Sequence, residues 1–339
     1  MTGLRLRILL LRLTLFIAPF LATIATPSGA EVIRLGLPQY HRRPGTIDST
    51  VAITVDSLAP GVYAAKVSYV WTGWVELPDG ILVIDTGFNE LSGRALADTI
   101  RARSGPLPIK YVVNTHEHAD HTGGDRYFGA LGATFVVHKS IAEEIKHSLT
   151  WAAGEVGDTL SHLGKVPTVK GIERRISYGG PKRPVQVISL GHPAHTAGDL
   201  VVYLPKQKIL FAGDLVSYKS VPWLLDPGMN VNGWLKSLDS LLTPAFQIDA
   251  LVPGHGVRGT PREEIQFANH YLLDAREKAA KVAGWGTSVE SVKDWGYLGP
   301  YEGMEFYEDV HFMNMRRLYN EAKGIKTPGR KNVRAIKRT

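Results

Sequence analysis

Three features of this 339-residue sequence predict an α/β fold. Short apolar runs rich in valine and isoleucine alternate with longer segments whose apolar residues recur at helical spacing. Several of the short runs are followed by histidine or aspartate and then by loop residues, a repeated pattern of strand, polar side chain and loop. Apolar residues make up 44% of the chain, which is enough to fill the core of one large domain.

Turn residues separate the strands expected in the first half of the chain. Ala59-Pro60-Gly61 and Pro78-Asp79-Gly80 are turn signals, and the residues around them alternate or run apolar. Strands are therefore expected at 51–56, 62–69 and 81–85. A helix at 90–103, a strand at 109–113, a short helix at 125–131, a strand at 133–137 and a helix from Ile141 to about Ala153 follow.

The second half begins with a segment, 154–183, that is loop-rich and shows no clear period. Beyond it, strands are expected at 185–190, 200–204, 209–212 and 248–252, the middle two forming a hairpin. Helical spacing returns at 232–242, 262–282 and 305–322.

A histidine-rich stretch follows the apolar run at 109–113. His116 and His118 have the two-residue spacing that puts side chains on the same side of an extended segment. His121 breaks that alternation and can face elsewhere. One short loop can therefore supply two adjacent metal sites, with spacing unlike that of a helical zinc motif.

Three further candidate ligands lie at the ends of later apolar runs: His195, Asp214 and His255. Imidazole and carboxylate groups are ligands that zinc accepts, and the chain contains no cysteine, which excludes a thiolate site. Ligands at the ends of different strands, gathered at one edge of stacked sheets, are how an α/β scaffold builds a site.

The motif His116-Glu-His118-Ala-Asp120-His121, with its later ligands, resembles the metallo-β-lactamase superfamily over about residues 50–260. The resemblance implies an αβ/βα four-layer sandwich, with a catalytic domain at 31–260 and C-terminal helices at 261–322 packed on it. By the family's pattern, the first metal takes His116, His118 and His195, the second takes Asp120, His121 and His255, and Asp214 bridges both.

Position 214 refines the resemblance. Typical β-lactamases of the superfamily have cysteine or serine there, so Asp214 makes this chain look more like the glyoxalase-II-like and lactonase-like hydrolases. The resemblance implies two zinc ions per chain, with iron or manganese also suited to nitrogen and oxygen ligands. A metal-bridging hydroxide, oriented by Asp120 as catalytic residue, would then hydrolyse an ester, thioester, lactone or lactam. The alternatives are a metal-dependent β-lactamase, a phosphodiesterase, and an accessory zinc protein of an exported oxidoreductase system.

Other residues are candidates for supporting roles. Asp85 ends the 81–85 strand and resembles the acid that orients a histidine ligand in this family. Aromatic and histidine side chains near the ligand loops are candidates for lining the substrate cleft: Trp71, Trp74, His192, Tyr218 and Trp223. We expect a small-molecule carbonyl substrate with an apolar or aromatic group.

Residues 1–30 have the features of a secretory signal peptide. They contain three arginines, no acidic residue, an apolar run and the small residues Ser28 and Ala30 before Glu31. Arg12 and Pro19 interrupt the run, which favours a cleaved leader over a permanent membrane anchor. The sequence therefore predicts a periplasmic or secreted protein with no stable membrane span after cleavage.

The basic charge of the chain is concentrated at its ends. The formal net charge of +7 falls to +4 without the three arginines of the leader. The tail at 323–339 carries seven lysines and arginines and no acid, which indicates a solvated terminus. Nucleic acid is therefore not an expected partner, because the segments around the ligands contain few basic residues.

Overall fold

The computed structural model describes residues 51–151 and 167–325. The expected leader at 1–30 and most of the basic tail lie outside this part of the chain. None of the helices within these two ranges is both long and apolar enough to cross a membrane.

The first half of the described chain forms a mixed sheet. Its strands are β1 (Ile53–Ala59), β2 (Val62–Val67), β3 (Val70–Leu77), β4 (Gly80–Ile84), β5 (Ile109–Val113), β6 (Thr134–His138) and β7 (Val169–Ile172). Strands β1 to β4 pair as an antiparallel meander, and β4 to β7 pair in parallel. Helices cover one face: α1 (Glu90–Ser104), α2 (Ala119–Thr122), α3 (Asp125–Ala130) and α4 (Ala142–Trp151).

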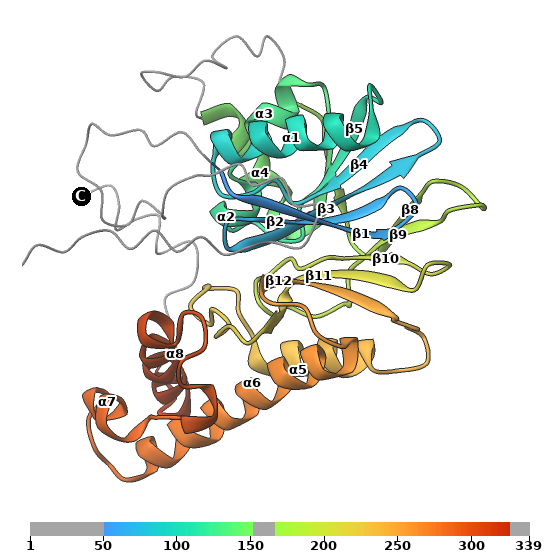
Figure 1. Cartoon of the computed structure of the whole chain (residues 1–339). Helices are drawn as coiled ribbons and strands as arrows, with labels where there is room; N and C mark the ends of the chain where they lie inside the picture. Colours follow the sequence, from blue (N-terminus) through green and yellow to red (C-terminus); the bar gives the residue numbers. More distant parts are fainter. Residues whose placement is uncertain (1–50, 152–166, 326–339) are drawn as a thin grey trace, which may run out of the picture. The chain divides into compact units, whose positions relative to one another are not determined.

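The second half forms a sheet with the opposite cover. Strands β8 (Arg175–Tyr178), β9 (Val185–Ile188), β10 (Val201–Leu204) and β11 (Ile209–Tyr218) pair antiparallel, and β12 (Ala250–Gly256) pairs parallel to β11. Helices α5 (Val231–Leu241) and α6 (Pro261–Gly284) lie on its outer face, and α7 (Val292–Trp295) and α8 (Tyr307–Ala322) follow (Figure 1).

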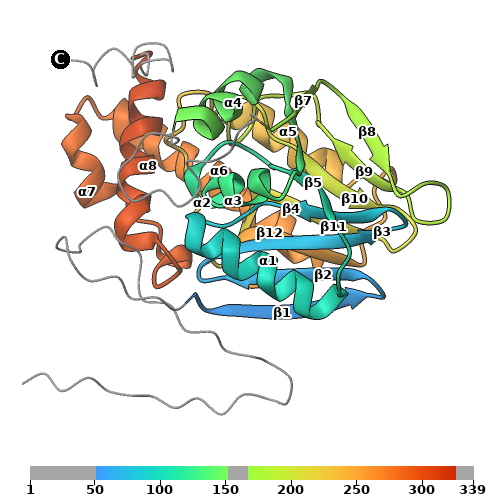
Figure 2. The same ribbon diagram turned by 90° about the horizontal axis from the view of Figure 1, so that it is seen from above.

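Three clusters of buried apolar side chains fill the spaces between four layers of helices and sheets. One packs the first sheet against its helices around Phe128 and Leu96, and one packs the second sheet against α5, α6 and α8 around Trp234. The third lies between the two sheets and joins Leu82 and Val113 to Phe211. Figure 2 shows the same fold from above, so that the layers lie over one another. The four-layer sandwich and the C-terminal helices expected from the sequence are confirmed.

The two sheets join along one line. The antiparallel pairing of His255 in β12 with Val70 in β3 connects them, so that one continuous hydrogen-bonded sheet runs through both halves. This junction places the end of β12 beside the turn between β2 and β3. A candidate ligand thus lies where the two halves meet.

Strand β3 and the short helices α2 and α7 were not expected from the sequence. Two further differences have a clear physical reason. The segment at 154–183 was expected to be loop, but it contains β7 and β8, which are four-residue strands with partly exposed patterns. Such short edge strands bury too few residues on one face to give a visible period. Strand β11 also extends to Tyr218, well beyond the expected 209–212, because a register irregularity at Gly213 interrupts the apolar pattern without ending the strand.

Candidate metal centre

The loop after β5 carries the histidine-rich motif, and the first half of the chain holds it tightly. Gly123 and Gly124 make this possible, because a Cβ at either position would clash with the backbone of Phe88 or Gly93. The backbone N–H of Thr86 donates to His121 O over 2.8 Å. The loop therefore packs directly on the chain that follows β4.

The later ligands are placed by irregular strand geometry. Gly213 has a φ of +53° at the bulge in β11, and a Cβ there would meet Thr115. A bulge re-aims the side chain beside it, and here that side chain is Asp214. Likewise, Gly256, with a φ of +82°, ends β12 directly after His255.

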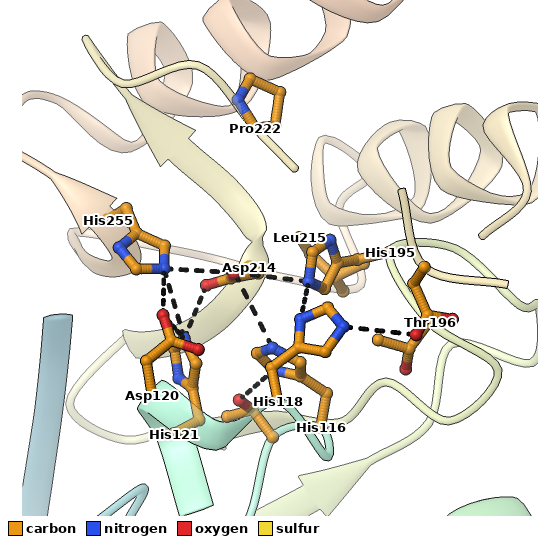
Figure 3. Close-up of polar contacts among 12 residues, drawn as sticks. His116, His118, Asp120, His121, His195, Thr196, Asp214, Leu215, Pro222 and His255 are labelled. Atoms are coloured by element: carbon orange, nitrogen blue, oxygen red, sulfur yellow. Dashed lines mark hydrogen bonds and ion pairs between the residues drawn. The ribbon is translucent and has the colours of Figure 1, made fainter. Parts of the chain in front are cut away.

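All seven candidate ligands converge at one place (Figure 3). They form two groups whose ligand atoms lie within 4.8 Å of one another: His116, His118, His195 and Asp214 in one, and Asp120, His121 and His255 in the other. Most are buried, with His121 and His195 fully inaccessible. The sequence motif and the three later residues thus come together as expected.

Asp214 lies between the two groups (Figure 3). Its Oδ2 is 3.3 Å from His195 Nε2 and 3.8 Å from His116 Nε2, both in the first group. The same carboxylate is 3.0 Å from His121 Nε2 and 3.3 Å from His255 Nε2, in the second group. Oδ2 thus faces histidines of both groups and Oδ1 faces His121, so this carboxylate is placed to be shared by two cations.

The residues fit a metal centre. His116 Nε2 is buried and finds no hydrogen-bond partner among the described residues. His195 Nε2 and His118 Nδ1 lie 3.0 Å apart, and His121 Nε2 and His255 Nε2 lie 3.4 Å apart. Buried polar atoms normally have partners, so ring nitrogens that face one another in this way are explained by cations bound between them.

The electrostatics of the cluster divide its histidines into two kinds. Burial lowers the pKa of His195 to about 3, and burial and the nearby His121 hold the pKa of His116 well below its usual value. Burial also opposes protonation of His255, but the carboxylates of Asp214 and Asp120 raise its pKa to about 10. The pKa of His121 is raised well above its usual value by the same acids and Asp85, against burial.

Asp85 lies where a ligand-orienting acid would be needed. Its Oδ2 accepts from His121 Nδ1 at 2.9 Å, and it also accepts from the Thr115 backbone N–H and hydroxyl, each at 2.8 Å. The bond to Nδ1 directs His121 Nε2 toward Asp214 and His255. Asp85 has a φ of +56°, a left-handed conformation that aspartate adopts more readily than most residues.

Sequence reasoning missed the corresponding partners of three other histidines. Asp226 Oδ2 lies 3.3 Å from His118 Nε2, and the Thr115 hydroxyl lies 3.1 Å from His116 Nδ1. The third partner is a backbone carbonyl, because His255 Nδ1 donates to Tyr69 O at 3.3 Å. Asp226 precedes Pro227-Gly228, so in the sequence it reads as a turn residue, and a carbonyl partner leaves no trace in the residue types.

The expected substrate-lining residues fall in different places. Trp74 does not line the site: it is fully buried between the first sheet and α1, stacks on Tyr63 and donates to the Ser104 hydroxyl. Trp71 belongs to the core between the sheets, 9% exposed, and its Nε1 donates to Gly256 O, one residue beyond His255.

His192 and Trp223 are both exposed, on the loops before His195 and before Asp226 respectively. Tyr218 is half-buried and packs edge-on against Phe267 in α6. Two aromatics not expected from the sequence flank His255: Tyr69 stacks on its ring at 5.8 Å, and Phe306 meets it edge-on at 5.8 Å.

The chain belongs to the metallo-β-lactamase superfamily, whose sequence profile matches residues 65–255. Its fold and its cluster of histidine and aspartate side chains are those of a metal-dependent hydrolase of that superfamily.

The names of similar proteins denote several different activities. The chain is 27% identical over 198 residues to metallo-beta-lactamase IND-1 of Chryseobacterium indologenes, covering 58% of this chain and 75% of that protein. It is 23% identical over 229 residues to 2,4-dinitroanisole O-demethylase subunit alpha of a Nocardioides species, covering 67% of this chain but 62% of that subunit.

Solved structures agree on the fold. A metallo-beta-lactamase from Pontibacter korlensis superposes with a TM-score of 0.53 at 23% identity, covering 65% of this chain and 99% of that one.

Proposed function

We propose that this protein is an exported dinuclear zinc hydrolase that cleaves an ester, thioester, lactone or lactam. The observation that carries the proposal is the position of Asp214, whose carboxylate lies within 3.3 Å of histidine nitrogens from both ligand groups. A single metal ion would need ligands from only one of the two groups. The second group is nevertheless complete, with its own orienting acid in Asp85.

Under this proposal His116, His118 and His195 hold one ion, Asp120, His121 and His255 hold the other, and Asp214 is shared. Two bound zinc ions supply a polarised substrate oxygen and a water of lowered pKa. Iron or manganese would satisfy the same donor set.

Asp120 has a distinct role among these residues. Its side chain is 25% exposed, while its Oδ2 lies 3.2 Å from His255 Nε2. Burial alone would raise the pKa of Asp120, but His121 and His255 lower it strongly, so the carboxylate is ionised. An ionised, accessible oxygen beside the ligands can accept a hydrogen bond from the reacting water and hold it in line with the substrate.

The identity of the residue at position 214 also favours some of the candidate substrate classes over others. The relatives include named metallo-β-lactamases, which supports a lactam as one substrate class. An aspartate in place of cysteine or serine at position 214 favours the other carbonyl classes. The related demethylase and a linear primary-alkylsulfatase indicate that ethers and sulfate esters belong in the same assay.

The decisive experiment combines metal content with a substrate panel. Zinc-loaded protein is expected to contain two zinc ions per chain and to turn over an aryl ester or lactone faster than a chromogenic cephalosporin, a bis-aryl phosphodiester, dinitroanisole or an alkyl sulfate. Asp214→Ala is expected to lose both metal and activity. Asp249→Asn is the matched control, because Asp249 is an exposed acid paired with Lys208 on the surface. One zinc ion per chain at saturation would contradict the dinuclear proposal.

Export is the second part of the proposal. It is supported by the arginines, apolar run and small residues of 1–30. N-terminal sequencing of the exported protein is expected to start at Glu31, and an exported chain starting at Met1 would contradict cleavage.

A further inference from the structure

We propose that the C-terminal segment from Glu305 to Arg317 is a positioning element of the metal centre. It holds the loop at 219–230, named here the β11–α5 loop, whose Asp226 carboxylate faces His118. This inference rests on the proposed function, because it assigns a role toward the same histidine cluster. The positioning residues are on α8 and just before it, far in sequence from every candidate ligand.

Backbone pairing fixes the start of the β11–α5 loop. Ser220 and Glu305 form an isolated parallel bridge. Within it, the Val221 N–H donates to Glu305 O at 2.9 Å, and the Glu305 N–H donates to Lys219 O at 3.2 Å. The first residues of the loop after β11 are therefore hydrogen-bonded to the residues just before α8.

Asn314 of α8 fixes the middle of the loop. Its Oδ1 accepts from the Leu224 N–H at 3.0 Å, and its Nδ2 donates to Pro222 O at 2.7 Å. The side chain is fully buried, so both bonds are made in a medium where an unpaired amide is costly. Pro222 itself lies apart from the histidine cluster (Figure 3), so Asn314 acts on the loop and not on a ligand.

Arg317 of α8 reaches the residue that carries the carboxylate. Its Nη1 donates to Asp226 O at 3.1 Å, and its Nε donates to Glu321 Oε1 at 2.9 Å. Asp226 then uses Oδ1 to accept from the Gly228 N–H at 2.6 Å and presents Oδ2 to His118 Nε2. The guanidinium thus fixes the backbone from which the carboxylate projects.

His118 is the histidine that most needs such support. Its side chain is 22% exposed, whereas His116 and His195 are buried. The same loop also contacts the chain around His195, since the Asn230 N–H donates to Ala194 O at 2.9 Å. A displaced β11–α5 loop would therefore disturb two of the three histidines of the first group.

The test uses zinc affinity and a nuclear magnetic resonance signal in three full-length variants. Arg317→Met removes the donor but keeps an unbranched chain, and Arg317→Lys restores one donor. Arg316→Met is the matched control, because Arg316 is the neighbouring cation on α8 and pairs with Glu290 on the exposed face. Competition with a chromophoric chelator gives the affinity, and ¹⁵N-labelled histidine gives the Nε2–H signal of His118 and its rate of exchange with water.

Arg317→Met is expected to hold one of its zinc ions roughly three- to tenfold more weakly, which is less than the 10- to 100-fold loss seen when a ligand's own hydrogen-bond partner is removed, because Arg317 acts through the backbone of Asp226. Its His118 Nε2–H is expected to exchange faster, Arg317→Lys to recover part of both effects, and Arg316→Met to match the unmutated protein. If Arg317→Met does not fold by circular dichroism, Arg317→Gln takes its place.

The two proposals fail in different ways. An unmutated protein that binds no zinc overturns the proposed function. An unmutated protein that binds zinc, beside an Arg317→Met variant with the same affinity and the same His118 signal, overturns the positioning role alone. A loss of thermal stability with both readouts unchanged would show that α8 is structural only.

Discussion

Replacing Asp85 by asparagine tests whether an orienting carboxylate sets the affinity of the second metal site. Asp85 accepts three hydrogen bonds, from the Thr115 N–H, the Thr115 hydroxyl and His121 Nδ1. Asparagine has a single acceptor oxygen and would present an N–H₂ group to a ring nitrogen that must donate. The backbone would tolerate the change, because asparagine readily adopts the left-handed conformation found at this position.

The size of the effect follows from the bond that is lost. A hydrogen bond to a charged group contributes about 1.5–3 kcal/mol, which corresponds to a loss of roughly 10- to 100-fold in affinity. Mutation of residues that orient metal ligands commonly has an effect of that size. We therefore expect Asp85→Asn to bind one zinc ion normally and the other about 10- to 100-fold more weakly.

Chelator competition measures both affinities, and activity at limiting zinc should fall in parallel. Asp79→Asn is the control, because Asp79 is a half-exposed acid paired with Lys110 in a turn and its loss should leave both sites unchanged. Equal affinity of both sites in Asp85→Asn and the unmutated protein would refute the reasoning.

Three further predictions address other residues. His255→Ala should retain one metal per chain by elemental analysis, whereas Asp214→Ala should retain almost none. Trp74→Ala should lower the free energy of unfolding in urea by about 3–5 kcal/mol with little change in KM, because Trp74 fills the core behind the first sheet. Burial raises the pKa of Glu264 from 4.5 to about 7, so the folded protein binds that proton more tightly than the unfolded chain. Stability should therefore fall as pH rises through this interval, and Glu264→Gln should remove that part of the slope.

The candidate metal ligands could be found from the sequence because each comes at or near the end of an apolar run and each is chemically distinctive. His116 and His118 have the spacing of an extended segment, and His255 lies between two glycines after an apolar run. Tertiary structure brings such strand ends together at one edge. The candidate ligands could therefore be gathered into one cluster before any contact was known.

What the sequence did not indicate was how the ligands are supported. Tyr69 holds His255 through a backbone carbonyl, so no side chain marks the interaction. Asp226 lies in a loop that reads as a turn, and Arg317 reaches it across many residues of chain. The expected place of Trp74 beside the substrate cleft differs from the observed one for a related reason. Alternation along a strand near a ligand does not show which face of the sheet carries the helices. Burial and long-range contact are properties of the packed layers.

The charges of the cluster bear on how many cations it takes. Asp85, Asp120 and Asp214 are carboxylates of one small region, and the partners that the structure shows for them are histidine and threonine. Without bound cations the compensating charge would come from protons, because the acids raise the pKa of His121 above its usual value and that of His255 to about 10, against burial. A ring nitrogen that binds a metal must give up its proton. Loading zinc at pH 7 in weak buffer should therefore release about two protons per chain, and His255→Ala, which is expected to lose the second ion, should release neither of them. A pH indicator or a calorimetric titration in buffers of different ionisation enthalpy would measure this. Zinc binding with no proton release would show that these two histidines are not ligands of the second ion.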